Sequence, residues 1–228
     1  MQHILEVLES KAMKDQLKMA LPSGVDLDRF VRTTRTYLQE SANNNPKFLQ
    51  CEAKAVFSGV MKGAQWGLEL GTGQCHLVPK GRNVQFLVGY QGYISLMKRN
   101  LELDVLTTQT VYKNDTIEFD YGSSPSFKHS WKFGEDRGPV TGFYCHAKFK
   151  NGSQTWETMT KKEMDIFKKE HGGFLWSKNE KQMALKTMIV RLAKRLGLED
   201  VDRAFSNADE QILDKDGRVT WPEVTEPQ

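Results

Sequence analysis

The sequence predicts an α+β fold, in which a small antiparallel sheet is flanked by helices and one long basic helix lies near the C-terminus. Hydrophobic residues recur at helical spacing before residue 66 and after residue 160, whereas short alternating segments fill residues 103–160. Asn151-Gly152, between the last two alternating segments, is typical of a type I′ β-hairpin. The chain has 228 residues, 39% of them hydrophobic, which is enough for a large domain with a core.

The first predicted elements are helices. Residues 1–25 are expected to form a loosely packed helical arm, because MQHILEVLESKAMKDQL has the pattern of an amphipathic helix. A second helix is predicted over Asp26–Leu38, with Asp26 as its N-cap and the run Asn43–Pro46 as its end. A third helix covers about Cys51–Gln65 and directs alanine, valine and methionine side chains inward.

A β-hairpin and a further helix follow. The predicted strands Cys75–Pro79 and Val84–Tyr90 enclose the turn Lys80-Gly81-Arg82-Asn83, so the tip of this hairpin is basic. Helical spacing returns over Gln91–Asn100. This strand-to-helix junction carries several of the candidate binding residues considered below.

Five more strands are predicted between residues 103 and 160. In the fourth, Phe143, Cys145 and Ala147 alternate with Tyr144 and His146. This alternation indicates one buried and one solvated face, as antiparallel sheets often have. The five predicted strands are Leu103–Tyr112, Thr116–Tyr121, Ser126–Phe133, Val140–Lys150 and Gln154–Met159.

Helices are predicted again after the last strand. Thr160 and Glu163 have the spacing of a capping box, which opens a helix. A long helix is predicted from about Asn179 to Leu196, with Gly197 as its C-cap. At about 100° per residue, its buried stripe consists of Leu185, Met188, Ile189, Leu192 and Leu196.

Charge is distributed unevenly, although the net charge is only +3. Residues 161–195 contain ten Lys or Arg and four Asp or Glu, a net of +6, whereas residues 199–228 contain nine acids and three bases, a net of −6. A basic block is typical of a protein that binds a polyanion, although a merely solvated helix face has similar charges. We expect residues 26–198 to form the core and residues 199–228 an acidic tail that competes with the polyanion, recruits a basic partner or maintains solubility.

Membrane and extracellular classes are disfavoured. No apolar run approaches the roughly 18 residues that span a bilayer, and the N-terminal stretch contains acids, unlike a signal peptide. The three cysteines Cys51, Cys75 and Cys145 have no close spacing, so reduced thiols are the simplest account of them. We therefore expect a cytoplasmic protein.

Motifs of enzymes and metal proteins are missing from the sequence. It contains no Gly-Lys dipeptide, which excludes a Walker A loop and with it ATP-driven recombinases and helicases. The dipeptides Cys75-His76 and Cys145-His146 lie on predicted strands, where adjacent side chains point to opposite faces, so they cannot supply four zinc ligands. No residues have nuclease, protease or glycosidase spacing. We expect a protein that is not an enzyme and needs no metal or cofactor.

The long predicted helix is basic on the side opposite its apolar stripe. It contains no acid between Glu180 and Glu199. Bases spaced along a helix can follow a phosphodiester backbone and replace its condensed counterions, and the apolar stripe lacks the Trp and Phe of a membrane-surface helix. Nucleic acid is therefore the favoured polyanion, with candidate contacts at Lys181, Lys186, Thr187, Arg191 and Lys194.

A second candidate surface includes the sequence GYQGY at residues 89–93. Tyrosine rings can stack on exposed bases without reading their sequence, and glycines allow a backbone to approach closely. Both properties favour a single-stranded ligand; the alternative is that the tyrosines belong to the core. The candidate contacts of this surface are Arg82, Tyr90, Gln91, Lys98 and Arg99.

Six blocks of sequence occur in a distinctive order between about Leu27 and Leu198: LDRFVRTTRTYLQESANNNPKFLQC, GAQWGLELGTGQCHLVP, VQFLVGYQGYISLMKRN, EDRGPVTGFYCHAKFKNG, WETMTKKEMDIFKK and WSKNEKQMALKTMIVRLAKRL. In this order they resemble the RecT family of phage and prophage single-strand DNA annealing proteins. The resemblance implies a core similar to those of other annealing proteins, which agrees with the α+β prediction.

The resemblance also implies an activity and partners. It implies ATP-independent binding of single-stranded DNA, annealing of complementary strands in homologous recombination, and assembly into rings or helical filaments. It implies action beside a 5′→3′ exonuclease and a host single-strand-binding protein in the bacterial cytoplasm. The alternative is a single-strand-binding, protective protein that uses the same residues without promoting annealing.

Overall fold

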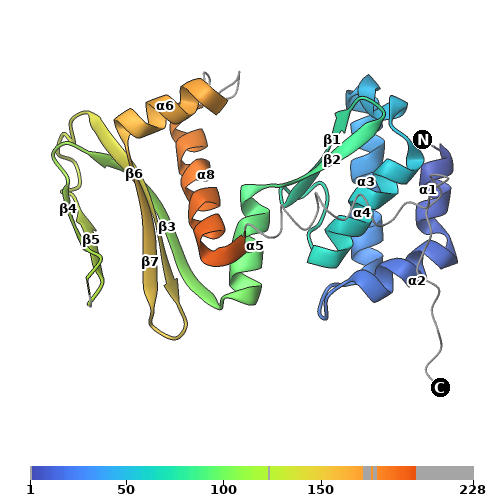
Figure 1. Cartoon of the computed structure of the whole chain (residues 1–228), viewed down its shortest axis with the longest axis horizontal. Helices are drawn as coiled ribbons and strands as arrows, with labels where there is room; N and C mark the ends of the chain where they lie inside the picture. The colour runs from blue at the N-terminus through green and yellow to red at the C-terminus, as the bar shows by residue number, and fades with distance from the viewer. Residues whose placement is uncertain (1, 123, 172–175, 177–178, 199–228) are drawn as a thin grey trace. The chain divides into compact units, whose positions relative to one another are not determined.

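The computed structural model describes residues 2–122, 124–171, 176 and 179–198 (Figure 1). The described chain forms two compact units, which divide between Gly92 and Tyr93. Each unit combines helices with short antiparallel strands, which confirms the predicted α+β class. The short helix and acidic tail expected after residue 198 lie outside the described residues.

Helices dominate the first unit: α1 (Gln2–Glu9), α2 (Lys11–Ala20), α3 (Leu27–Asn44), the 3₁₀ helix η1 (Pro46–Gln50) and α4 (Ala53–Trp66). The single helix expected at the N-terminus is wrong, because the chain breaks at Ser10. The Ser10 hydroxyl accepts a hydrogen bond from the Met13 amide at 3.3 Å and so caps α2. Leu8 and Leu17 are fully buried, which fixes α1 and α2 against α3 and α4.

Helix α3 begins at the predicted cap and runs further than predicted. The Asp26 carboxylate accepts a hydrogen bond from the Arg29 amide at 2.7 Å, as expected of an N-cap. The helix continues to Asn44 and ends before Pro46, which lacks the amide hydrogen that a helix interior requires. Phe30 and Leu38 of this helix are fully buried in the unit.

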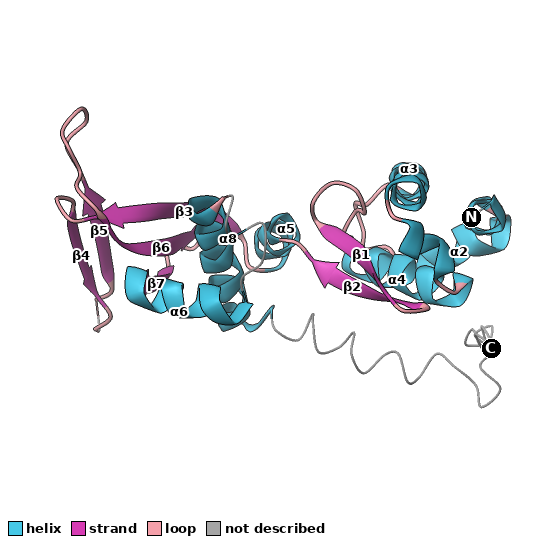
Figure 2. Cartoon of the chain, turned by 90° about the horizontal axis from the view of Figure 1, so that it is seen from above, coloured by secondary structure: helices cyan, strands magenta, loops and turns pink. Residues whose placement is uncertain are grey.

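Strands β1 (Cys75–Lys80) and β2 (Asn83–Val88) form the predicted antiparallel hairpin. Gly81 in its turn has a φ of 63°, a left-handed conformation that suits glycine. The hairpin packs against α4 (Figure 2). The Tyr37 hydroxyl of α3 also donates to the Leu77 carbonyl at 3.2 Å and accepts from the Leu77 amide at 2.8 Å. The hairpin is thus held by two helices.

The second unit consists mainly of a three-stranded sheet with helices on one face. Its strand order is β3-β6-β7, and both pairings are antiparallel. Its elements are α5 (Tyr90–Asn100), whose first turn belongs to the first unit, β3 (Leu103–Tyr112), β4 (Thr116–Asp120), β5 (Ser126–Ser130), β6 (Val140–Phe149), β7 (Gln154–Thr160), α6 (Lys161–His171), α8 (Glu180–Ala193) and the π-helical turn η2 (Lys194–Leu198). These bounds lie within a few residues of those predicted.

The two faces of this sheet are both covered (Figure 1). Cys145 and Ala147 are fully buried on the face against which α8 packs, as expected. The solvated face predicted for Tyr144 and His146 is wrong, because the β4–β5 hairpin folds over it. The ring of Phe127 lies 4.6 Å from that of Tyr144 and 5.0 Å from that of His146, centroid to centroid. Aromatic packing therefore replaces solvent on this face.

The turn between β6 and β7 forms at the predicted position with a different conformation. A type I′ turn needs positive φ at both central residues, but Gly152 has a φ of 84° and Glu102 is the sole described non-glycine residue with positive φ. The Gly152 amide donates to the Phe149 carbonyl, and the Phe149 amide donates to the Ser153 carbonyl, both at 2.9 Å. This pattern is a type I turn followed by a glycine bulge.

Candidate nucleic-acid interface

Helix α8 begins with its one acidic residue, and that residue is neutralised by α6. Glu180 forms an ion pair with Lys161 at 3.2 Å and another with Lys168. Hydrogen bonds from these two lysines hold the pKa of the Glu180 carboxyl below its usual range. Beyond its first turn, α8 carries basic and neutral side chains only.

The buried side of α8 packs against all three strands of the sheet. Met188, Ile189 and Leu192 are buried as predicted. The prediction was wrong for Leu185 and Leu196, which are only half-buried. Fully buried side chains at Ala184 and Ala193 lie on this side instead, because small residues let the helix backbone approach the sheet closely. Sequence hydrophobicity favours the larger leucines and so misplaces the centre of the stripe.

Two arginines near the end of α8 converge on one carboxylate of β7. Arg191 donates to Glu157 Oε1 from Nε at 3.2 Å and from Nη2 at 2.9 Å. Arg195 donates to Glu157 Oε2 at 3.1 Å and to the Trp156 carbonyl at 2.9 Å. The Glu157 side chain is 15% exposed, whereas Arg191 remains 43% exposed and Arg195 49% exposed. The cluster therefore presents two cations for one largely covered anion.

The other predicted residues of this helix differ in their surroundings. Lys181 is exposed, and its Nζ donates to the Tyr112 hydroxyl at 3.0 Å. The Thr187 hydroxyl donates to the Met183 carbonyl of its own helix at 2.9 Å, which leaves its oxygen available as an acceptor. Lys186 and Lys194 are half-buried. The structure thus places all five predicted residues along α8 and the start of η2.

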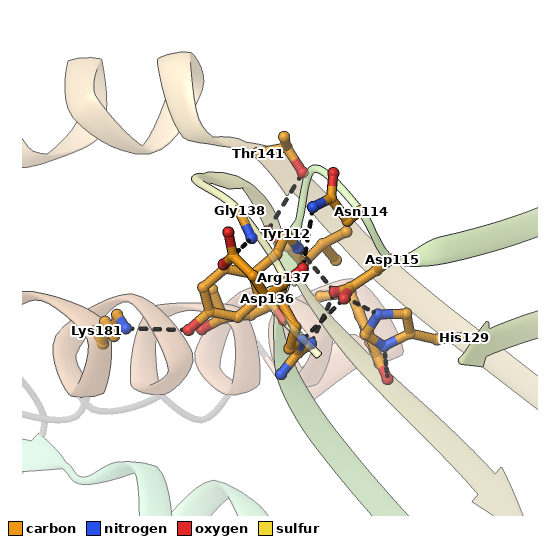
Figure 3. A network of polar contacts seen from close by, with 12 residues as sticks. Tyr112, Asn114, Asp115, His129, Asp136, Arg137, Gly138, Thr141 and Lys181 are labelled. Atoms are coloured by element: carbon orange, nitrogen blue, oxygen red, sulfur yellow. Dashed lines mark hydrogen bonds and ion pairs between the residues drawn. The ribbon is translucent and has the colours of Figure 1, made fainter. Parts of the chain in front are cut away.

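A buried carboxylate lies beside Tyr112, where the sequence carried no motif (Figure 3). The Asp115 side chain is 0% exposed and receives two hydrogen bonds from Arg137, at 2.8 and 2.7 Å. His129 Nε2 lies 3.0 Å from the same carboxylate, and the Tyr112 amide donates to it at 2.8 Å. Hydrogen bonds from Arg137 hold the pKa of Asp115 well below its usual range. Arg137 also donates to the Thr110 carbonyl of β3 at 3.3 Å, so the network ties Arg137 to β3 and to the turn that follows it.

The remaining predicted residues lie around the β1–β2 hairpin and α5. Arg82 is 80% exposed in the hairpin turn, and its Nε lies 3.3 Å from Glu52 Oε1. The Tyr90 hydroxyl accepts a hydrogen bond from Nε2 of the Gln91 side chain at 2.9 Å. Lys98 and Arg99 are exposed in the last turn of α5. The first three belong to the first unit, and Lys98 and Arg99 belong to the second.

The glycines of the GYQGY segment have a packing role. A Cβ atom on Gly89 would lie 2.2 Å from the Gly73 carbonyl oxygen, and one on Gly92 would lie 2.2 Å from the backbone carbonyl oxygen of Gln74. Glycine at both positions therefore allows the segment to pack against residues 71–74. Tyr93 is buried in the core, as the alternative interpretation of the tyrosines required, whereas Tyr90 is half-buried.

Within the described ranges, no helix is long and apolar enough to cross a membrane, and no three His, Cys, Asp or Glu side chains are grouped to hold a metal ion. The three cysteines are free and buried. Burial raises the pKa of the Cys75 and Cys145 thiols to about 12, so both stay protonated at neutral pH.

Comparison with known proteins identifies relatives of this chain. The model of the RecT family matches residues 28–220, which include most of both units. Protein RecT of Escherichia coli K12 is 29% identical over 224 residues, which cover 92% of this chain and 81% of that protein. The matched residues include every candidate contact on α8, on α5 and around the β1–β2 hairpin.

Proposed function

Because the chain belongs to the RecT family of single-strand annealing proteins of DNA recombination, we propose that it binds single-stranded DNA and anneals complementary strands without ATP, as an oligomer. The observation that carries this proposal is the basic surface of α8 and η2. Five cations lie between residues 181 and 195, and the one acid of α8 is neutralised by α6. This surface suits a phosphate backbone.

The first strand binds through its phosphates to α8. Lys181, Lys186, Arg191 and Lys194 neutralise phosphate charge, and the Thr187 hydroxyl adds a polar contact. Contacts of this kind are independent of base sequence, which annealing of any complementary pair requires. The bases are left with free pairing edges.

A second group of contacts comes from Arg82, Tyr90, Gln91, Lys98 and Arg99. The exposed cations among them reduce repulsion between phosphates when a complementary strand approaches. Tyr90 supplies a ring on which a base can stack. Many subunits along the DNA then keep both strands extended, and base pairing makes the duplex the stable product.

The proposed activity requires partners that prepare the DNA. A 5′→3′ exonuclease would supply single strands with 3′ ends, and a host single-strand-binding protein would cover the strands before annealing. Neither partner is needed for the pairing step, because the energy of that step comes from the complementary bases.

The direct test mixes two complementary oligonucleotides with purified protein and monitors their annealing by fluorescence energy transfer. We expect faster annealing without nucleotide and no change on addition of ATP or a non-hydrolysable analogue. Binding of one strand should weaken with salt, with a log–log slope of about −3 to −4 per subunit if roughly four to six phosphates are neutralised.

Three outcomes of this experiment oppose the proposal. Tight binding without faster annealing would identify a protective single-strand-binding protein. An ATP requirement would contradict the nucleotide-independent mechanism. A salt slope near zero would exclude phosphate neutralisation as the basis of binding. Size-exclusion chromatography with and without DNA tests oligomer formation separately.

A further inference from the structure

Trp131, Arg137 and Tyr112 form a stack in the second unit. The Arg137 guanidinium carbon lies 4.3 Å from the ring centroid of Tyr112 and 4.3 Å from that of Trp131, so the cation is sandwiched between two aromatic rings. Two hydrogen bonds to the fully covered Asp115 carboxylate fix the guanidinium (Figure 3). Arg137 therefore links the buried carboxylate to both rings.

Trp131 keeps much of its surface in solvent despite this support. Its side chain lies against Arg137 and has its ring centroid 5.0 Å from that of His129, yet the residue is 42% exposed. An exposed aromatic ring that already packs against a neighbouring side chain offers its free surface to a flat ligand. Holding the ring in advance also lowers the entropy lost when a ligand stacks on it.

Two lysines lie near the stack. Lys181 donates to the Tyr112 hydroxyl at 3.0 Å, and its Nζ lies 5.3 Å from the Tyr112 ring centroid. Lys132, next to Trp131 in the chain, is 80% exposed, with Glu135 3.3 Å away. An exposed ring and exposed lysines in the same unit offer the two kinds of contact that a nucleotide needs, a stacking face for the base and a cation for the phosphate.

We propose that the exposed ring of Trp131 is a stacking platform for a base of single-stranded DNA and that Lys181 contacts a phosphate of the same strand. This inference rests on the proposed function and adds to it Trp131, which is absent from the predicted contacts. Stacking engages the face of a base and leaves its pairing edge free, so the platform is compatible with annealing. The exposed charged side chains near the ring, Lys132 and Lys181, favour DNA over an apolar protein surface, which would have to desolvate them.

Phe119 of β4 provides a matched control. It is 44% exposed, close to the 42% of Trp131, and lies in the same unit. Its described ring contacts are with Tyr121 at 5.6 Å and Phe127 at 6.3 Å, both aromatic neighbours of the hairpin. Removing Phe119 therefore removes a similar exposed ring without touching the Trp131–Arg137–Tyr112 stack.

The test compares full-length Trp131→Ala, Trp131→Phe, Trp131→Leu and Phe119→Ala on two ligands. One ligand is oligo-dT, and the other is a strand of equal length made of abasic sites, which keeps the phosphates. Trp131→Ala should weaken oligo-dT binding by roughly five- to 150-fold, as expected for loss of one base–aromatic stack. It should bind the abasic strand like the wild type, and the salt slope should not change.

The conservative variants separate stacking from packing. Trp131→Phe should retain most of the affinity, because it keeps a flat ring, whereas Trp131→Leu should behave like Trp131→Ala although it keeps apolar bulk. Phe119→Ala should bind both ligands like the wild type. Circular dichroism and size-exclusion chromatography of each variant establish that fold and oligomeric state are unchanged.

Several outcomes would overturn the platform. Equal oligo-dT affinity of Trp131→Ala and wild type would show that Trp131 does not stack on a base. An equal loss on both ligands would assign Trp131 to local structure. A changed oligomeric state with unchanged DNA affinity would make the ring a contact between copies of the chain. Failure of the wild type to bind oligo-dT would instead reject the proposed function.

Discussion

At the scale of single residues, Glu157 determines how much positive charge the end of α8 presents to solvent. It holds Arg191 and Arg195 on its two oxygens. Arg191→Ala should weaken binding of single-stranded DNA several-fold and reduce the salt slope by about 0.7, the share of one phosphate.

Glu157→Gln should have the opposite effect and strengthen DNA binding at low salt, because it removes one negative charge from beside two arginines. Salt titrations of both variants measure this.

The matched control for Glu157→Gln is Glu118→Gln. Glu118 is an exposed residue of β4, so its replacement changes the net charge equally without altering the arginine cluster. Equal gains from the two substitutions would show that net charge alone governs binding. A gain limited to Glu157→Gln, with thermal melts close to wild type, would assign the effect to Arg191 and Arg195.

At the scale of elements, α8 is held by the side that packs on the sheet. Leu192→Ala should lower the free energy of unfolding by about 2–5 kcal/mol, because Leu192 is fully buried and its truncation leaves a cavity. Leu185→Ala should cost clearly less, because Leu185 is half-buried. Urea denaturation measures both values, and equal costs would contradict the observed orientation of the helix. The folded fraction of each variant should bind DNA normally.

Most element bounds were predictable from the sequence because they depend on local signals. Asp26 and the Thr160–Glu163 capping box begin helices where their spacing indicates, and the Glu163 carboxylate accepts from the Thr160 amide at 2.8 Å. The covering of the second sheet face was not predictable, since alternation in β6 does not show what packs on it. Ion pairs between residues far apart in the chain were equally unpredictable from the sequence. Arg137 bonds to Asp115 across 22 residues, and Arg191 bonds to Glu157 across 34.

The candidate site, too, was only partly predictable from the sequence. Its cations on α8 were predicted from charge and spacing alone, whereas the Trp131–Arg137–Tyr112 stack left no periodic signal. The stack depends on three residues from different segments that the fold brings together. Sequence patterns detect residues that share one element, and they miss sites assembled from several.

At the scale of the whole molecule, opposite charges follow one another along the chain. Residues 161–195 carry a net charge of +6 and residues 199–228 a net charge of −6. A tail of this charge competes with DNA phosphates for the same cations if it can reach them. Recruitment of a basic partner or maintenance of solubility are the other roles open to it, and neither alters DNA affinity of the isolated protein.

Competition makes a prediction for a full-length variant with a less acidic tail. Replacing Asp209, Glu210, Asp214 and Asp216 by Asn or Gln removes four of the nine acidic charges and changes the tail from −6 to −2. We expect tighter binding of single-stranded DNA at low salt and a smaller difference at high salt, because the Debye length falls from about 30 Å at 0.01 M to about 10 Å at 0.1 M. The control makes the same four-charge change at exposed residues Glu6, Asp15, Glu40 and Glu118. Equal gains from the control would reduce the effect to net charge, and no gain at any salt concentration would leave the partner and solubility roles.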